Sequence, residues 1–187
     1  MNAYLEIKLL PDPKRLPTTL MSTLFSKLHG GLATHGRKNI GVSFPDSDEK
    51  HGTLGARLRL HGDESELKKF MKSDWMTGMG VHVSVSEITA VPIHAKYRAV
   101  RRVQAKSSPE RERRRLMARK RVSAEIAKQV IPDNAAQRLY LPYLVLTSQS
   151  TGQRFRFFVE HLPIQKQAVN GTFGAYGLSP VATVPWF

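Results

Sequence analysis

The amino-acid sequence predicts an α+β fold, with a ferredoxin-like domain over residues 1–93 and a basic domain over residues 94–187. Two observations predict the first domain. Apolar residues alternate with polar ones in short segments, and between these segments they recur at the spacing of amphipathic helices. The resulting order, strand-helix-strand-strand-helix-strand, is the ferredoxin-like order. The third observation is a change after Pro92 to polar, basic sequence, which predicts an arginine-rich helix and two β-hairpins.

The first strand is expected at residues 4–9, where apolar side chains occupy alternate positions. A helix is expected from Pro17 onwards, because apolar residues then recur at helical spacing. These residues are Leu20, Met21, Leu24, Phe25, Leu28 and Leu32. The pattern weakens at a group of glycines, so His29 is expected near the end of this helix.

Two strands, a short helix and a fourth strand complete the first domain. They are expected at residues 40–44, 54–61, 63–71 and 81–85. In the helix, Leu67, Phe70 and Met71 are expected to face inward, and the run Val81, Val83 and Val85 is expected to form the last strand.

The basic domain opens with residues 96–107, which are polar and without clear periodicity. We interpret them as an extended linker with weak strand character. A helix is then expected over residues 109–121, with Ser108 as the N-cap and Pro109 in the first turn. Glu110 complements the positive end of the helix dipole.

One half of this helix carries a row of arginines. At 100° per residue the row consists of Arg111, Arg114, Arg115 and Arg119, while Arg113, Leu116, Met117 and Lys120 point elsewhere. Guanidinium groups at successive turns match phosphates along a groove, because the planar group binds phosphate oxygens in pairs. DNA and RNA both offer such phosphates. The major groove of A-form RNA admits a helix only where a short stem, loop or end opens it, so an RNA hairpin fits best.

A second helix is expected at residues 124–130, beginning at a serine N-cap. Two β-hairpins should follow. The first pairs residues 144–149 with 154–159 around a turn at 150–152, and the second is joined at residues 170–171.

The charge distribution favours a polyanionic partner bound by the second half of the chain. The formal net charge is +14. Residues 1–93 hold 12 Lys and Arg against 10 Asp and Glu, or +2, whereas residues 94–187 hold 17 against 5, or +12. A basic surface of this strength is typical of nucleic-acid binding.

The composition also limits the kind of site and the cellular location. The chain has no cysteine, which excludes disulfides and cysteine-ligated metals. No signal-peptide pattern and no run of 18 apolar residues is present, so we expect a soluble, cytoplasmic protein without a membrane partner.

For chemistry on a nucleic acid, the sequence offers no HExxH motif and no clustered pair of acidic residues. We therefore expect no metal and no cofactor. RNA carries its own nucleophile, the 2′-hydroxyl, and needs only a proton acceptor active near neutral pH, a role that suits histidine. Seven histidines compete, and His29 is one candidate. Ser148 lacks the GxSxG context of an acyl-transfer nucleophile. Arg102 and Gln104 are residue types that can read guanine and adenine edges.

Several segments together resemble the CRISPR repeat-processing endoribonucleases of type I-F systems, the Csy-type guide RNA processing family. They are LMSTLFSKLH at 20–29, GVSFPD at 41–46, RVQAKSSPERERRRLM at 102–117, SQSTG at 148–152 with the following Phe155, YGLS at 176–179 and VPWF at 184–187. The resemblance spans nearly the whole chain. It implies a ferredoxin-like domain followed by an arginine-helix domain.

The resemblance implies an endoribonuclease that binds a CRISPR repeat hairpin and cuts it at the 3′ base of the stem without metal. The 2′-hydroxyl attacks the adjacent phosphate, leaving a 5′-hydroxyl and a 2′,3′-cyclic phosphate. The guide RNA then stays bound as part of a type I-F interference complex with other subunits. This chain departs from the family at one position of the arginine-rich helix: it has Ala118 where the family typically has another arginine.

The resemblance also assigns residues. His29 matches the proton acceptor, Ser148 the serine that holds the 2′-hydroxyl, and Tyr176 a tyrosine that orients the histidine. Arg102 and Gln104 match readers of the lowest base pairs. Phe155 matches an aromatic that stacks under the stem, and Arg114, Arg115 and Arg119 match the helix that enters the groove. Beyond what the resemblance assigns, the expected RNA-binding set also includes Ser150, Arg111 and Lys120.

Two other interpretations stay open from the residues themselves. A non-catalytic subunit that binds structured RNA could use the same basic helix and ferredoxin-like domain. A DNA-binding regulator could place the arginine helix in a B-form major groove and would not depend on a 2′-hydroxyl.

Overall fold

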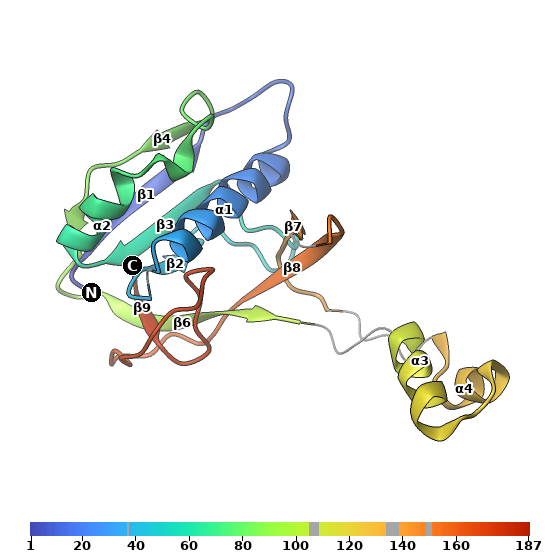
Figure 1. Cartoon of the computed structure of the whole chain (residues 1–187). Helices are drawn as coiled ribbons and strands as arrows, with labels where there is room; N and C mark the ends of the chain where they lie inside the picture. The colour runs from blue at the N-terminus through green and yellow to red at the C-terminus, as the bar shows by residue number, and fades with distance from the viewer. Residues whose placement is uncertain (37, 105–108, 134–138, 149–150) are drawn as a thin grey trace. The chain divides into compact units, whose positions relative to one another are not determined.

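The computed structural model describes residues 1–36, 38–104, 109–133, 139–148 and 151–187. Within these ranges the chain forms two antiparallel sheets and four α-helices (Figure 1), which confirms the expected α+β class. No helix in the described ranges is both long enough and apolar enough to cross a membrane.

The first sheet has the strand order β2-β3-β1-β4, and all of its pairings are antiparallel. Its strands are β1 (Ala3–Leu9), β2 (Gly41–Ser43), β3 (Arg57–Gly62) and β4 (Val83–Val85), with β5 (Thr89–Ala90) also pairing with β1. Two helices, α1 (Pro17–Thr34) and α2 (Glu64–Met71), cross the same face of this sheet (Figure 1), and a short 3-10 helix, η1 (Asp74–Met76), follows α2.

The apolar stripe predicted for α1 is the buried face of that helix. All six of its expected residues, from Leu20 to Leu32, are at most 1% exposed. Gly31 lies against Trp75, where an added Cβ atom would come within 2.7 Å of the tryptophan side chain. The last expected strand departs from its pattern, because Val83 is buried while Val81 and Val85 are 81% and 40% exposed. Strand β4 is only three residues long and lies at the sheet edge, so the alternation does not extend to Val81.

The second sheet has the order β7-β8-β6-β9 and is also antiparallel. It contains β6 (Lys96–Val103), β7 (Tyr143–Thr147), β8 (Arg154–His161) and β9 (Thr183–Trp186). The first expected hairpin is therefore confirmed as β7–β8.

Residues 96–107 are expected from the sequence to be an extended linker with weak strand character. The first eight of them form strand β6 inside the sheet, so the strand character is confirmed and the linker is wrong for those residues. The periodicity was hidden because arginines stand where apolar residues would be expected. Arg98 and Arg102 flank Val100 on one face of the strand. Their guanidinium carbons lie 4.5 Å from the Trp186 ring centroid and 4.8 Å from the Phe157 ring centroid, respectively.

The second expected hairpin, joined at residues 170–171, is also wrong. Residues 162–182, all described, contain no strand, and β9 pairs with β6 instead. Here the Asn-Gly sequence lies in a loop that is held to the start of β9. The Val169 amide donates to the Thr183 hydroxyl at 2.9 Å, and Gly171 packs against Ala182.

The chain divides into two compact units that differ from the expected boundary at residue 93. One comprises Met1–Val103 with Leu141–Phe187, and the other Gln104–Tyr140. Both sheets contribute to one hydrophobic core, in which Phe25 of α1 contacts Phe157 of β8 at a centroid distance of 5.3 Å. Strand β6 therefore belongs with the first sheet's unit.

The second unit contains α3 (Pro109–Lys120) and α4 (Ala124–Val130), which confirms both expected helices. Ser123 caps α4 by accepting a hydrogen bond from the Ile126 amide at 3.3 Å. Arg113 of α3 donates hydrogen bonds to the Ile131 carbonyl and to the Asp133 carboxylate, both of which follow α4. The Arg113 guanidinium lowers the pKa of Asp133. The expected N-cap Ser108 lies outside the described residues.

We expect the first unit to lose stability in mild acid because two histidines are buried in uncharged form. Burial, aided by Arg59, lowers the pKa of His61 to about 3, and burial, aided by Arg98, lowers that of His161 to about 4. Below pH 6.5, the ordinary histidine pKa, the unfolded chain binds protons that the folded chain does not. The free energy of unfolding should therefore fall by up to about 1.4 kcal/mol per pH unit for each histidine as the pH drops from about 6.5 to 4.5.

Urea unfolding at several pH values measures this effect. The exposed His94 offers a matched control, because His94→Gln removes a histidine but leaves both buried histidines in place. Constant stability between pH 7 and 5 would contradict the assignment.

Candidate active site

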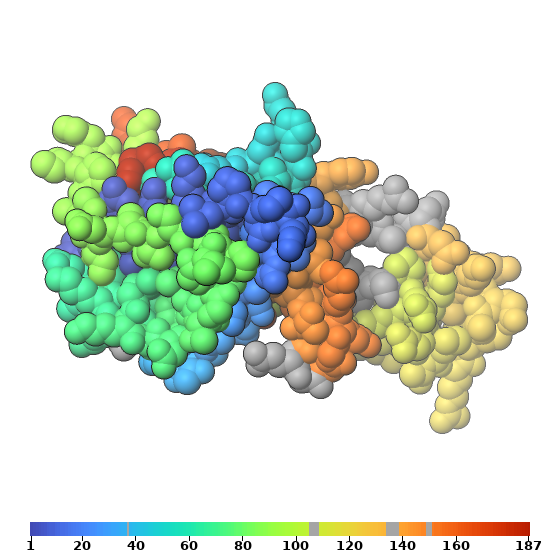
Figure 2. Space-filling model, turned by 90° about the horizontal axis from the view of Figure 1, so that it is seen from above, coloured from blue at the N-terminus to red at the C-terminus, as the bar shows by residue number. Residues whose placement is uncertain are grey.

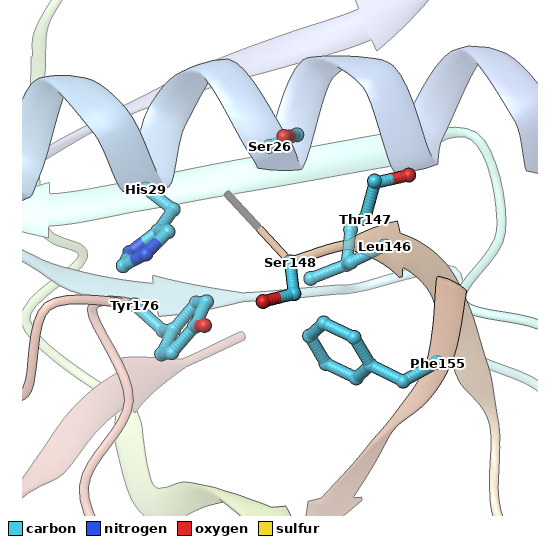
Figure 3. A pocket seen from close by; sticks show the side chains of 7 residues that line it. All are labelled: Ser26, His29, Leu146, Thr147, Ser148, Phe155 and Tyr176. Atoms are coloured by element: carbon cyan, nitrogen blue, oxygen red, sulfur yellow. The ribbon is translucent and has the colours of Figure 1, made fainter. Parts of the chain in front are cut away.

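A cavity of about 290 Å³ opens between α1, the β7–β8 hairpin and the loop before β9. Figure 3 shows its seven lining side chains, which are Ser26, His29, Leu146, Thr147, Ser148, Phe155 and Tyr176. Figure 2 shows the blue α1 packed beside the orange hairpin, and the Val145 amide of β7 donates to the Ser22 hydroxyl of α1 at 3.2 Å. The structure thus brings His29, Ser148, Phe155 and Tyr176 together from distant parts of the chain.

His29 has a defined tautomer. Its Nδ1 atom lies 2.8 Å from the Ala175 carbonyl oxygen, which can only accept a hydrogen bond, so Nδ1 carries the proton. The other ring nitrogen, Nε2, therefore holds a lone pair in the neutral imidazole. In that form, Nε2 is chemically able to accept a proton.

Tyr176 holds the imidazole ring in place. The two rings stack with centroids 3.8 Å apart and an interplanar angle of 15°. The Tyr176 ring also contacts two fully buried aromatic rings. Its centroid lies 4.6 Å from that of Phe157 and 6.0 Å from that of Phe25. The histidine is thereby packed onto the hydrophobic core through one tyrosine.

The loop that carries Tyr176 is fixed by the next residue. Gly177 has φ +68° and lies so close to Val42 that a Cβ atom would collide with that side chain. Its carbonyl accepts from the Val42 amide at 2.8 Å. These contacts join the loop to β2 and fix the position of the Ala175 carbonyl as well.

Ser148 lies at the mouth of the β7–β8 hairpin. Its amide donates to the Gln153 carbonyl at 2.9 Å, and its hydroxyl accepts from the Thr151 amide at 3.3 Å. Figure 3 shows the Ser148 hydroxyl between Tyr176 and the ring of Phe155. Ser150, also expected in the site, lies outside the described residues.

Arg102 lies beside the cavity but does not line it. Its guanidinium carbon lies 5.5 Å from the Tyr176 ring centroid and 5.6 Å from that of Phe155, and its buried Nε atom has no hydrogen-bond partner among the described residues. Gln104, just after β6, is exposed and belongs to the second compact unit.

On α3, the four arginines of the expected row are exposed, and so is Lys120, which the helical wheel placed outside that row. The exposed basic residues are Arg111, Arg114, Arg115, Arg119 and Lys120. Leu116, Met117 and Arg113 are partly covered, consistent with the contact that Arg113 makes to α4. The second unit therefore presents a basic, solvent-accessible face.

Sequence reasoning missed three parts of the site. The Ala175 carbonyl could not be anticipated, because a backbone oxygen carries no residue signature. The supporting role of Phe157 was equally hidden. Ser26 did have a signal, since it precedes His29 by three residues and so shares its side of a helix. No three His, Asp or Glu side chains cluster as metal ligands in the described ranges.

Comparison with known proteins gives full-length matches. The model of the family described as "CRISPR-associated protein (Cas_Csy4)" matches residues 4–187. A protein of Pseudomonas aeruginosa (strain UCBPP-PA14) named "CRISPR-associated endonuclease Cas6/Csy4" is 50% identical over 187 residues, covering 100% of both chains. One of the same name from Escherichia coli (strain UTI89 / UPEC) is 42% identical over the same length and coverage.

Proposed function

The chain belongs to the Cas_Csy4 family of CRISPR-associated proteins, and we propose that it is an endoribonuclease that binds a CRISPR repeat hairpin and cuts it at the 3′ base of the stem. The observation that carries this proposal is the His29 ring, whose Nδ1 is bonded to a carbonyl and whose Nε2 is left as an acceptor beside Ser148. The names of both relatives, each an endonuclease, point the same way.

In the proposed reaction the nucleophile comes from the RNA. His29 Nε2 takes the proton from the 2′-hydroxyl, whose oxygen then bonds to the adjacent phosphorus while the bond to the 5′ oxygen breaks and that oxygen takes up a proton from solvent water. The products are a 2′,3′-cyclic phosphate and a 5′-hydroxyl end. Ser148 holds the attacking hydroxyl in line, and the Ala175 carbonyl keeps the imidazole in the required tautomer.

Ring stacking gives Tyr176 its role. Tyr176 fixes the plane of the His29 imidazole by stacking on it at a centroid distance of 3.8 Å. The Tyr176 ring is itself held by contacts with the rings of Phe25 and Phe157. Phe155, half-buried at the cavity, offers a face on which the last base pair of the stem can stack.

We assign recognition of the RNA hairpin to basic residues and to Gln104. The exposed arginines of α3 would bind phosphates along the hairpin stem, while Arg102 and Gln104 would read its lowest base pairs. We further infer that the first sheet with α1 and α2 is a ferredoxin-like domain, which the order β2-β3-β1-β4 supports. The cut RNA would stay bound, within a type I-F complex of further subunits.

The test incubates the purified protein with an end-labelled repeat RNA and maps the cut and its termini. The proposal expects one cut at the 3′ base of the stem, with a cyclic phosphate on one product. A repeat with a disrupted stem is the control and should resist cleavage. Tight binding without any cut would favour a non-catalytic RNA-binding subunit, and a preference for duplex DNA would favour a regulator.

We expect the phosphate-binding arginines to act through charge. Arg115→Gln or Arg119→Gln should each weaken hairpin binding and lower the slope of log Kd against log salt by about one unit, because one counterion-releasing contact is lost. Arg102→Gln is the comparison. It should instead reduce discrimination at one base pair by roughly 1 to 3 kcal/mol. Equal losses for matched and mismatched stems would make Arg102 a phosphate contact.

A further inference from the structure

Ser26 presents a hydroxyl to the cavity without an internal partner. It lies on α1 and lines the cavity together with His29 (Figure 3). Among the residues that the structure describes, its Oγ atom has no hydrogen-bond partner. The two neighbouring hydroxyls differ, since Ser22 donates to the Thr18 carbonyl at 2.8 Å and Thr23 to the Thr19 carbonyl at 3.0 Å.

Helix geometry gives Ser26 and His29 a common target. Residues three apart are neighbours on a helix surface and differ by about 4.5 Å in height. Ser148 and Phe155 line the same cavity from the β7–β8 hairpin. If the 2′-hydroxyl of the RNA binds at His29, the adjacent phosphate lies along the same side of α1. Its non-bridging oxygens would then come near Ser26.

The cavity needs such a donor. None of its seven described lining residues is Lys, Arg, Asp or Glu. During 2′-hydroxyl attack, negative charge grows on the two non-bridging oxygens of the phosphate, and fixed hydrogen-bond donors stabilise that charge. The Ser148 hydroxyl is assigned to the nucleophile. The other described hydroxyls that line the cavity are those of Ser26, Thr147 and Tyr176, and of these only Ser26 lies on the same helix as His29.

We propose that the Ser26 hydroxyl donates a hydrogen bond to a non-bridging oxygen of the scissile phosphate and is a substrate-binding residue of the reaction. This inference rests on the proposed ribonuclease function. It adds a contact from α1 itself, made by a hydroxyl that the fold leaves available.

The test combines Ser26→Ala with sulfur substitution at the scissile phosphate. Alanine removes only the hydroxyl and favours the helix, so the fold should persist. With the all-oxygen hairpin, single-turnover cleavage should slow by about tenfold or more, below the 100 to 1,000-fold of a fully buried oxyanion donor because the site is open to solvent. In the wild type, sulfur at one of the two non-bridging positions should slow cleavage, and Ser26→Ala should reduce that thio effect while leaving the other position's effect unchanged.

Ser22→Ala is the matched control, because it removes a hydroxyl one turn away that is already bonded to Thr18 and Val145. It should retain both wild-type thio effects. Wild-type rates and thio effects in Ser26→Ala would overturn the inference, as would a slower rate with both thio effects unchanged. A wild-type protein that cuts no RNA would instead defeat the proposed function.

Discussion

A repeat RNA that carries 2′-deoxyribose immediately 5′ of the scissile phosphate is expected to remain uncut. The proposed nucleophile is the 2′-oxygen of that sugar, which the deoxyribose lacks. His29 Nε2 would then have no proton to accept. The loss should be complete within detection, while binding should stay close to that of the ribose hairpin because the phosphates and base edges are unchanged.

The measurement compares both hairpins at saturating protein, with and without EDTA. The intact RNA should be cut at the same rate in EDTA, since the proposed proton transfer uses a side chain. A requirement for magnesium in the chemical step, or cutting of the deoxy copy, would remove the mechanism. Moving the deoxy sugar one nucleotide downstream provides the control and should leave cleavage intact.

The first sheet and its helices could be predicted because each element obeys one simple periodicity. Leu5 and Ile7 alternate with polar residues, and the buried residues of α1 recur every three or four positions. The second sheet was harder to predict. In β6 the inward positions at 98 and 102 hold arginines that stack on aromatic rings, a contact invisible to hydropathy.

The loop before β9 shows a different limit. An Asn-Gly pair is typical of a two-residue hairpin, yet here tertiary contacts to Thr183 and Ala182 decide its conformation. Tertiary contacts also explain why the domain boundary expected at residue 93 could not be predicted from composition. The strand that follows it packs into the core of the first unit, although its charge is that of the basic half.

For the candidate site, residue chemistry indicated a histidine as the proton acceptor but could not choose among the seven histidines of the chain. His29, Ser148 and Tyr176 are more than 25 residues apart in sequence, and only the resemblance to a known family grouped them. The geometry adds a physical reason to prefer His29. His161 is buried, with a pKa lowered to about 4, and His35 bonds its Nδ1 to the Gly31 carbonyl and does not line the cavity.

His29→Ala is therefore expected to slow cleavage by about 100 to 10,000-fold, the usual contribution of a positioned general acid or base. Hairpin affinity should change little, because the proposed phosphate and base contacts come from other residues. The measurement is single-turnover cleavage at saturating protein, beside equilibrium binding of the 2′-deoxy hairpin. His35→Ala, a change of the same kind at the end of the same helix, should cut within a few-fold of the wild type.

Ser148→Ala separates proton transfer from alignment. Without the serine the 2′-hydroxyl drifts out of line with the phosphate, so the rate should fall while the position of the cut stays the same. Wild-type rates for His29→Ala would reject the assignment and direct attention to the other histidines.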